Sequence, residues 1–270
     1  MSHFVVFADM LGFAQLTLQH PPSEDDFTSF ERPEVNDFLR ASLEKGEASP
    51  LVSSFVCFHT AVDEAVFNAR RAGGPVTSVA FSDSAFMACE NIHTATQFAS
   101  SLLNKLLPMG VMVRVGIAHG TFTAIRFRAD VGLNSGDHAA QFLGTGVVRA
   151  YSAAERSGFK GARILLHPSI QADPAGGLYL QLAQTGPFWK PIEVSDDESR
   201  NTMGIKYEMN YLGRHDRNLY KGVYRASQSA PPEAAKHYED TFKAMNRMRK
   251  KLGRDPVPPK YFDSEATTEG

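Results

Sequence analysis

The spacing of apolar and polar positions changes several times along the chain, and each change predicts an element. The run FVVFA at positions 4–8 is rich in Phe and Val, which is typical of a strand buried on both faces. The run ends at Asp9, and Gly12 allows a sharp turn before a mostly apolar helical stretch, Phe13–Leu18. A second apolar stretch, VTSVAFSDSAFMAC at 76–89, is interrupted by Asp83 between two serines, and this predicts a tight hairpin with Asp83 at its tip.

The rest of the chain predicts further helices and strands. Helical spacing or composition predicts helices at 36–44, 51–72, 93–107, within 142–159 after Gly144 and Gly146, and at 231–252. Strand-like runs occur at 111–119, 122–127, 163–166 and 207–212. This order predicts an α/β sandwich with one mixed sheet and helices on one face.

Composition restricts the class of protein. The chain has 270 residues, 43% of them apolar, which is enough for one large domain or two small ones with a sizeable core. Its net charge of -2 gives no basic field for nucleic acid, and Cys57 and Cys89 lie in apolar runs, as expected for core residues in a reducing compartment. The N-terminal run has no basic leader and is interrupted by Asp9, so we expect a cytoplasmic protein without a signal peptide or membrane span.

Asp9 and Asp83 are the strongest candidates for chemistry. Asp9 alone is explained equally well as the cap of the following helix. Because Asp83 also stands at a strand end, in a different part of the chain, the pair suggests a shared site for divalent cations that carry phosphates.

Four motifs in chain order resemble the signatures of class III nucleotidyl cyclases. They are FADMLGF (7–13), FSDS (81–84), VRVGIAHG (113–120) and GTGVVRAYSAAE (144–155), and the resemblance covers about residues 3–170. It implies an α+β, ferredoxin-like or palm-like domain over residues 1–228 that forms a head-to-tail homodimer with composite active sites. Residues 19–50 look like an insertion in that domain, 229–256 form a C-terminal helix, and 257–270 look disordered.

The resemblance assigns roles to several residues. Asp9 and Asp83 would hold two divalent cations, Mn²⁺ or Mg²⁺, with help from the backbone of Met10. The amides of Gly12 and Phe13 would cradle the β- and γ-phosphates of a nucleoside triphosphate. Lys221, followed by Gly222 near a predicted C-terminal strand, resembles the late Lys-Gly pair with which some cyclases hold terminal phosphates.

Other positions depart from the purine cyclase pattern. Val79 and Gln141 stand where purine cyclases place charged base-reading residues. The family's Asn and Arg, which steady ribose and phosphate, fall at Val148 and Ser152. Arg149 or Arg156 would supply the missing charge, or both are surface arginines; the sequence leaves these alternatives open.

Loss of purine readout with both carboxylates retained resembles the pyrimidine cyclases of bacterial Pycsar anti-phage systems. That resemblance implies synthesis of cyclic UMP from UTP, or of cyclic CMP from CTP, with a separate effector that senses the product. We favour the uridylate cyclase over the cytidylate cyclase.

Three other classes were weighed against this interpretation. A haloacid dehalogenase-type phosphatase needs a second Asp where Leu11 stands, and a diguanylate cyclase needs a hairpin signature that FSDS does not match. A catalytically inactive cyclase-like module that binds nucleotides or a partner is favoured by Val148 and Ser152, and disfavoured by the two aspartates.

Four further features have structural interpretations that we prefer. We expect Arg114 to pair with a core carboxylate, His119 to be structural, and Trp189 to serve packing. The basic end of the last predicted helix, 247–251, is expected to be a solvated face.

Overall fold

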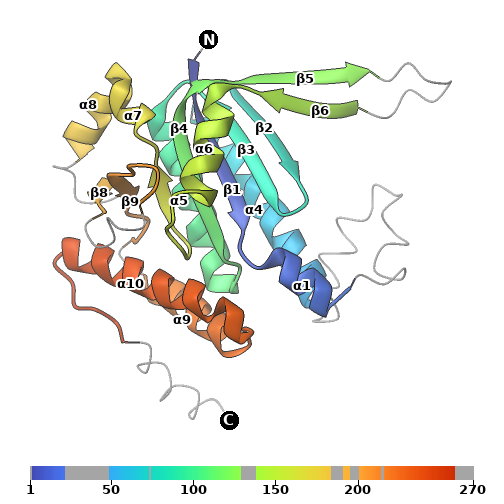
Figure 1. Cartoon of the computed structure of the whole chain (residues 1–270), viewed down its shortest axis with the longest axis vertical. Helices are drawn as coiled ribbons and strands as arrows, with labels where there is room; N and C mark the ends of the chain where they lie inside the picture. The colour runs from blue at the N-terminus through green and yellow to red at the C-terminus, as the bar shows by residue number, and fades with distance from the viewer. Residues whose placement is uncertain are drawn as a thin grey trace.

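Figure 1 shows the computed structural model of the chain, which describes residues 2–21, 49–72, 74–128, 138–183, 191–194, 201–213 and 216–258. The strands are β1 Ser2–Met10, β2 Val76–Phe81, β3 Ser84–Cys89, β4 Val113–Thr121, β5 Thr123–Arg128, β6 His138–Leu143, β7 Ile164–Leu166, β8 Pro191–Glu193 and β9 Tyr207–Met209. The α-helices are α1 Phe13–Gln19, α4 Pro50–Arg71, α5 Ile92–Leu106, α6 Thr145–Glu155, α7 Ser169–Ala172, α8 Pro174–Ala183, α9 Arg217–Gln228 and α10 Ala235–Lys251. Two 3₁₀ turns, η1 Leu107–Met109 and η2 Pro232–Ala234, complete the described elements. Among the described helices, none combines the length and apolar character needed to cross a bilayer.

Seven strands form one mixed sheet in the order β2-β3-β1-β4-β7-β9-β8. Strand β1 is antiparallel to both β3 and β4, whereas β4 and β7 are parallel. The order β2-β3-β1-β4, with α4 and α5 as the connecting helices, is the βαββαβ arrangement of a ferredoxin-like domain. The predicted mixed sheet and ferredoxin-like core are therefore confirmed. Strands β5 and β6 form a separate ribbon that extends away from the sheet (Figure 1).

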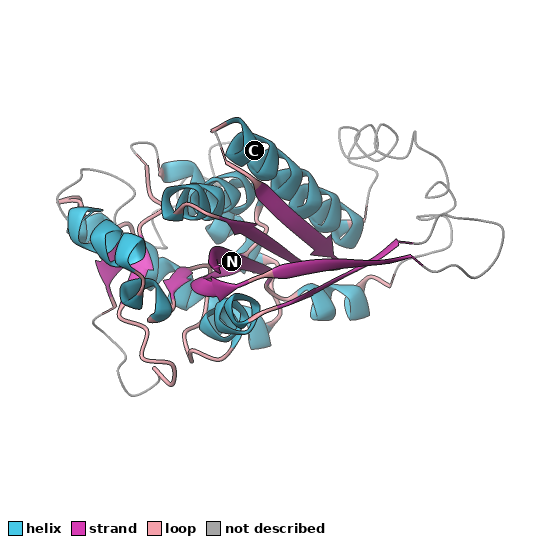
Figure 2. Ribbon diagram, turned by 90° about the horizontal axis from the view of Figure 1, so that it is seen from above, coloured by secondary structure: helices cyan, strands magenta, loops and turns pink. Residues whose placement is uncertain are grey.

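The two faces of β1 pack against different helices. Alternate residues Phe4, Val6 and Ala8 join the large core cluster with α4 and α5, because successive side chains in a strand point to opposite faces. Val5 and Phe7 instead join a smaller cluster with Ala150 and Ala154 of α6. The expected helical layer thus covers one face, and α6 in addition covers the other, so helices lie on both sides of the central strands (Figure 2).

Local sequence signals explain where the long helices begin. The Ser49 side chain accepts a hydrogen bond from the Val52 N–H (3.2 Å), and Pro50 occupies the first position of α4, where its missing N–H costs nothing. Asn91 caps α5 in the same way and accepts from the His93 N–H at 2.8 Å. These caps set the first residues of α4 and α5, the two helices that pack on one face of the sheet.

Helix α6 lies unusually close to β4. A Cβ atom at Gly116 would overlap the carbonyl oxygen of Ala150 and lie 2.9 Å from the Ala154 nitrogen. A Cβ at Gly120 would lie 2.5 Å from the nitrogen of Gly146. Only glycine permits this approach, so the motif glycines fix the position of α6 on the sheet.

The C-terminal helix is attached through buried ion pairs. Glu208 of β9 is fully buried, and it accepts hydrogen bonds from Arg163 Nε (2.6 Å) and Arg247 Nε (3.0 Å). Asp216 similarly pairs with Arg249 at 2.7 Å. The expectation of a solvated basic face is therefore wrong for Arg247 and Arg249, because β9 and the start of α9 supply carboxylates that no local pattern reveals.

Some elements were not predicted from the sequence. Strand β6 and helices α7, α8 and α9 are absent from the prediction, and Lys221 lies in α9 rather than near a strand. The α9 segment contains Tyr and Val, which favour strands, yet its buried residues Leu219, Tyr220 and Val223 follow helical spacing. Most of the expected insertion at 19–50, with its short helix at 36–44, and Trp189 lie outside the described residues, as does the tail after residue 258. The division of the chain at residue 228 stays a prediction.

Gly116→Ala tests the close approach of α6. We expect the free energy of unfolding to fall by more than about 3 kcal/mol, because the methyl group would displace helix backbone rather than a flexible side chain. Urea unfolding measures the change. Gly74→Ala is the control, because a Cβ there meets nothing within 4 Å; equal stability of the two variants would contradict the packing described.

Glu208→Gln tests the buried ion pairs. The variant leaves Arg163 and Arg247 facing a neutral group in a buried setting, and we expect a loss of about 3 kcal/mol of stability. The control is Glu239→Gln, which removes an exposed pair with Lys243 and should leave the urea midpoint nearly unchanged. A Glu208→Gln midpoint equal to that of the control would show that the network does not stabilise the fold.

Candidate active site

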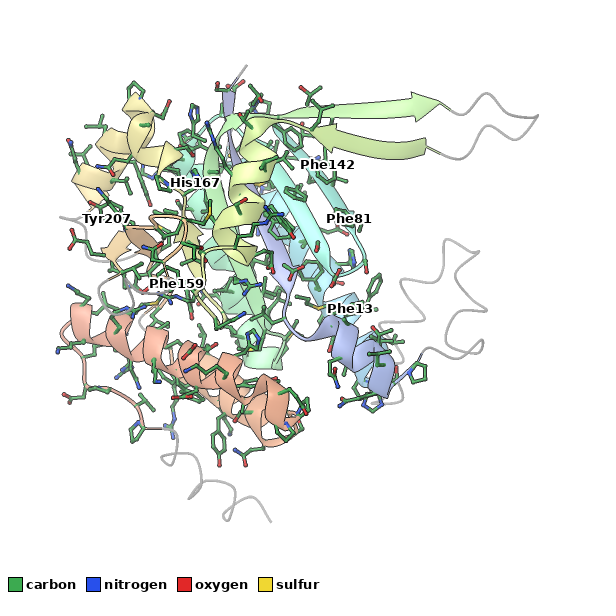
Figure 3. The ribbon with its side chains drawn as sticks, viewed as in Figure 1. Phe13, Phe81, Phe142, Phe159, His167 and Tyr207 are labelled. Atoms are coloured by element: carbon green, nitrogen blue, oxygen red, sulfur yellow. The ribbon has the colours of Figure 1, made fainter. Side chains whose placement is uncertain are left out.

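The β2–β3 hairpin brings Asp83 beside the end of β1. Asp9 lies directly opposite Ser84 of β3, and the Met10 N–H donates a hydrogen bond to the Asp83 carbonyl oxygen at 2.8 Å. Two carboxylate residues distant in sequence therefore share one end of the sheet. Figure 3 labels Phe81, just before the turn, and Phe13, at the start of α1, which flank this region.

The turn at the tip of the hairpin is held from α4. Ser82 has a left-handed backbone (φ 47°), which a two-residue hairpin turn requires and which Ser adopts at some cost. His59 Nε2 lies 2.7 Å from the Ser82 carbonyl oxygen, and the His59 ring contacts Phe55. The helix α4 thus fixes the position of Asp83. Sequence reasoning missed His59, since nothing local connects it with a turn more than twenty residues away.

Asp9 is partly withdrawn from water. Burial, together with the nearby carboxylates of Glu155 and Asp83, raises the pKa of its carboxyl group from the ordinary 3.8 to about 6. Two contacts act in the opposite direction: the Ser84 hydroxyl, which donates to Asp9 Oδ1 at 2.7 Å, and the guanidinium of Arg114. The Ser84 contact was also missed, although the serines beside Asp83 are visible in the sequence. The ionised form of Asp9 is therefore destabilised, and a bound cation would stabilise it.

The carboxylate oxygens of Asp9 and Asp83 suit a divalent cation that binds together with a phosphate-bearing substrate. The described residues contain no cluster of three or more His, Cys, Asp or Glu side chains that would make a complete protein cage. Mg²⁺, however, is commonly held by one or two carboxylates together with substrate phosphates and water. Asp9 and Asp83 match that pattern. Any help from the Met10 backbone would come from its carbonyl oxygen, because its N–H is a donor and is bonded to the Asp83 carbonyl oxygen.

The loop after β1 turns sharply at Gly12. Gly12 has φ 80°, in the left-handed region that favours glycine, and it precedes the first residue of α1. No side chain caps this N-terminus, and the ring of Phe13 packs against Phe55 at 6.2 Å. The amides of Gly12 and Phe13 therefore adjoin Asp9 and Met10, as the sequence predicts; their role in binding phosphates stays a prediction.

Aromatic rings surround the position of Val79. Val79 is half-buried on β2, directly opposite Phe86. The ring of Phe142 lies 4.5 Å from that of Phe86 and 5.9 Å from that of Phe81, stacked on the latter (Figure 3). Gln141 directly precedes Phe142 in β6. The strand that carries one predicted base-reading position therefore contacts, through the Phe142 ring, the strand β2 that carries the other.

Arg149 lies far from the aspartates within one chain. Its Nη1 atom donates to the His119 carbonyl oxygen at 3.0 Å, near the end of β4. Asp9 is opposite Arg114, near the start of the same strand, which places the two levels about 17 Å apart at 3.3–3.4 Å per residue. Arg156, at the other end of α6, lies over the Tyr151 ring at 5.6 Å. The structure therefore does not bring Arg149 to Asp9 within a protomer.

The two positions predicted to match the family's Asn and Arg differ in their surroundings. Val148 is 63% exposed, whereas Ser152 is buried. Lys221 is half-buried in α9, one turn before Arg225, and its predicted position near a strand is wrong. A phosphate-binding role for Lys221 stays untested.

Arg114 and His119 have the structural roles expected of them. Arg114 is buried and its Nε atom donates to Glu155 Oε1 at 3.1 Å, which links β4 to the end of α6. His119 Nε2 lies 3.4 Å from Asp173 Oδ1, near α7. The prediction that Arg114 pairs with a carboxylate is confirmed.

Comparison with protein-family models and with curated protein sequences finds no match. Among solved structures, the chain is similar to the guanylate cyclase domain of a rhodopsin–guanylyl cyclase from Catenaria anguillulae in complex with GTP (16% identity, 77% of this chain and 93% of that one, TM-score 0.43). It is also similar to a bacterial light-regulated adenylyl cyclase (13%, 84% and 57%, TM-score 0.48) and to adenylate cyclases of Trypanosoma brucei in their monomeric state (14%, 79% and 89%, TM-score 0.45). These neighbours are class III nucleotidyl cyclase domains. At such low identity and TM-score, the function has to be inferred from the site itself.

The raised pKa of Asp9 predicts a specific pH dependence of stability. Between its ordinary value of 3.8 and about 6, the folded protein holds a proton that the unfolded chain has released, so wild-type stability falls as pH rises through this window. Asp9→Asn removes this loss, and in metal-free buffer we expect its stability relative to wild type to increase from pH 4 to pH 6.5 and then stay constant. Urea unfolding with a chelator present measures the difference.

The matched control is Asp63→Asn, on the exposed side of α4. Its stability relative to wild type should not show the rise between pH 4 and pH 6.5. A flat difference for Asp9→Asn as well would mean that Asp9 is not desolvated in solution.

Proposed function

We propose that the protein is a nucleotidyl cyclase that converts a nucleoside triphosphate to its 3′,5′-cyclic monophosphate and pyrophosphate. The observation that carries this proposal is the meeting of Asp9 and Asp83 at one end of the sheet, with Asp9 desolvated and short of positive charge. In the reaction the 3′-oxygen forms a bond to the α-phosphorus while the bond from that phosphorus to the pyrophosphate oxygen breaks. The 3′-hydroxyl proton passes to solvent.

Positioning and electrostatics are the tasks of this chain's own residues. Asp9 and Asp83 would hold two divalent cations, Mn²⁺ or Mg²⁺, which when bound lower the pKa of a hydroxyl and neutralise phosphate charge. The Ser84 hydroxyl holds the Asp9 carboxylate, whereas His59 and the Met10 N–H hold the backbone of the turn that carries Asp83. The amides of Gly12 and Phe13 orient the β- and γ-phosphates, so the reaction needs no nucleophilic Ser or Cys.

We propose a pyrimidine nucleotide as substrate, with UTP converted to cyclic UMP and CTP as the alternative. Val79 carries no charge or hydrogen-bonding group, and its surroundings are aromatic: Phe81, Phe86 and Phe142. Such a surface suits the flat face of a base but lacks the charged readout expected for adenine. Val79 and Gln141 are accordingly proposed to line the base pocket.

A head-to-tail homodimer would complete the site. Within one protomer Arg149 lies about 17 Å along the sheet from the level of Asp9, by strand geometry. An antiparallel arrangement of two copies would bring Arg149 of one protomer towards the aspartates of its partner. The exposed apolar residues Val148 and Tyr151 on the outer side of α6 support a surface that is covered in the dimer.

The proposed product would act as a second messenger. The resemblance of the chain to Pycsar cyclases suggests a cytoplasmic enzyme that responds to phage infection, and a separate effector that binds the cyclic nucleotide. This part of the proposal rests on the sequence motifs alone.

A second candidate is a cyclase-like module that binds nucleotides without turnover. The specific observation in its favour is that Val148 and the buried Ser152 offer no charge where the family places its Asn and Arg.

The test is to incubate the purified protein separately with ATP, GTP, CTP and UTP, with Mn²⁺ or Mg²⁺, and to identify products by mass. We expect cyclic UMP from wild type. Asp9→Ala and Asp83→Ala should each lower the rate at least about a thousandfold, the scale of losing electrostatic stabilisation of the transferred group. A chelator should abolish turnover.

Asp63→Ala is the matched carboxylate control and should keep full activity. A cyclic purine would overturn the pyrimidine assignment while leaving the cyclase. Turnover that survives in both aspartate variants would contradict the site, and absence of turnover in folded, dimeric protein that still binds UTP would favour the binding module.

A further inference from the structure

A cavity lies between the loop after β1 and the C-terminal helices. Its volume is about 760 Å³, within the range of pockets that enclose small-molecule ligands. One wall comes from Met10 to Leu16 and the start of α4, a second from residues 108–112, and a third from the end of α9, η2 and the start of α10. Four segments distant in sequence thus line it.

The wall is mainly apolar. Leu11, Phe13 and Leu16 line it from the first wall and Met109, Val111 and Met112 from the second, and alanines and a proline form much of the third. An apolar lining with a few polar groups is the usual character of a small-molecule site.

The charged side chains of the lining are few and have no partners among the residues that the structure describes. The side chains of Arg225, on the last turn of α9, and of Glu233, in η2, form no hydrogen bond or ion pair with any of these residues. Most of the described arginines of the C-terminal segment, such as Arg247, Arg249 and Arg254, are by contrast paired with carboxylates.

His237 adds a polar group to the same wall. Its buried Nδ1 atom has no hydrogen-bond partner among the described residues. Burial, with Arg114 and Lys160 nearby, lowers the pKa of His237, so the imidazole is neutral at pH 7 and the formal charges of this wall are those of Arg225 and Glu233.

We propose that this cavity binds a small apolar molecule that carries one anionic group, with the apolar part between α1 and residues 109–112 and the anion on Arg225. The guanidinium is suited to a carboxylate, sulfonate or phosphate group because it offers several donors in a fixed plane. Arg225 is chosen as the anchor over Lys221, which lies one turn earlier on α9 and does not line the cavity.

The site goes beyond the proposed catalysis but adjoins it. Met10, Gly12 and Phe13 line the cavity, and the Met10 N–H also bonds to Asp83. A ligand in the cavity therefore contacts the loop that carries the candidate phosphate-binding amides. The site is distinct from the aspartates, and its test does not depend on turnover.

The probe is 8-anilinonaphthalene-1-sulfonate, an aromatic anion whose fluorescence rises in apolar surroundings, titrated into the full-length protein. We expect saturable binding of one probe per chain. Arg225→Gln should raise the dissociation constant of the probe about fivefold, which is the effect of losing one charge-assisted contact at a partly exposed site. Glu233→Gln should tighten it about twofold, because it removes a like charge. Lys250→Gln, an exposed residue of α10 outside the cavity, is the control and should leave binding unchanged.

Ala234→Trp fills the cavity and should abolish binding, with unfolding by heat as the check that the variant folds. Arg225→Gln and Glu233→Gln change only exposed side chains, so their opposite effects decide the matter even where the tryptophan variant fails to fold. Binding that is non-saturable, or that is the same in wild type and in both charge variants, would overturn the proposal. Either result is separate from the nucleotide assay, whose failure would leave this site standing.

Discussion

The structure depends on the burial of β1 on both of its faces and along both of its edges. Phe4, Val6 and Ala8 face α4 and α5, Val5 and Phe7 face α6, and the backbone is paired with β3 on one side and β4 on the other. A slip by one residue would exchange the side chains that pack against α4 and α5 with those that pack against α6, and it would shift the pairing with both β3 and β4. Asp9 lies near the end of this buried strand, so the packing of the whole core sets its position. The β2–β3 hairpin then places Asp83 beside it.

The parts of the fold that the sequence predicted are those in which local pattern and tertiary environment agree. FVVFA is apolar at every position because both sides are buried, and FSDS combines two strand ends with a turn, so β1 and the β2–β3 hairpin could be identified without the structure. Helix α9 could not, because its Tyr and Val residues favour a strand and only their contacts with the core select a helix. The ion pairs of Arg247 and Arg249 are likewise formed with residues more than thirty positions away, a separation at which a single sequence carries no signal.

The candidate site divides in the same way. Two carboxylates could be named because a charged residue at the end of an apolar run is visible in the sequence. The contacts that position them, from Ser84, His59 and the Met10 N–H, follow from the register of β1 on β3 and from the place of α4. The predicted base-reading positions, Val79 and Gln141, are single residues in the sequence, whereas the contact among rings from three elements, Phe81, Phe86 and Phe142, is visible only in the structure.

The close contact between α6 and β4 has a consequence for how this protein can change over evolutionary time. Gly116 and Gly120 hold the inner side of the helix against the strand with no room for a side chain, so that side cannot vary without moving the backbone. The outer side carries the exposed residues Val148, Arg149 and Tyr151, where packing within the protomer sets no such limit and only the proposed dimer contact would constrain the side chains. New side chains can therefore be tried on that surface while the scaffold keeps its shape. The residues that maintain the fold and the residues that could change its binding partners therefore lie on opposite sides of the same helix.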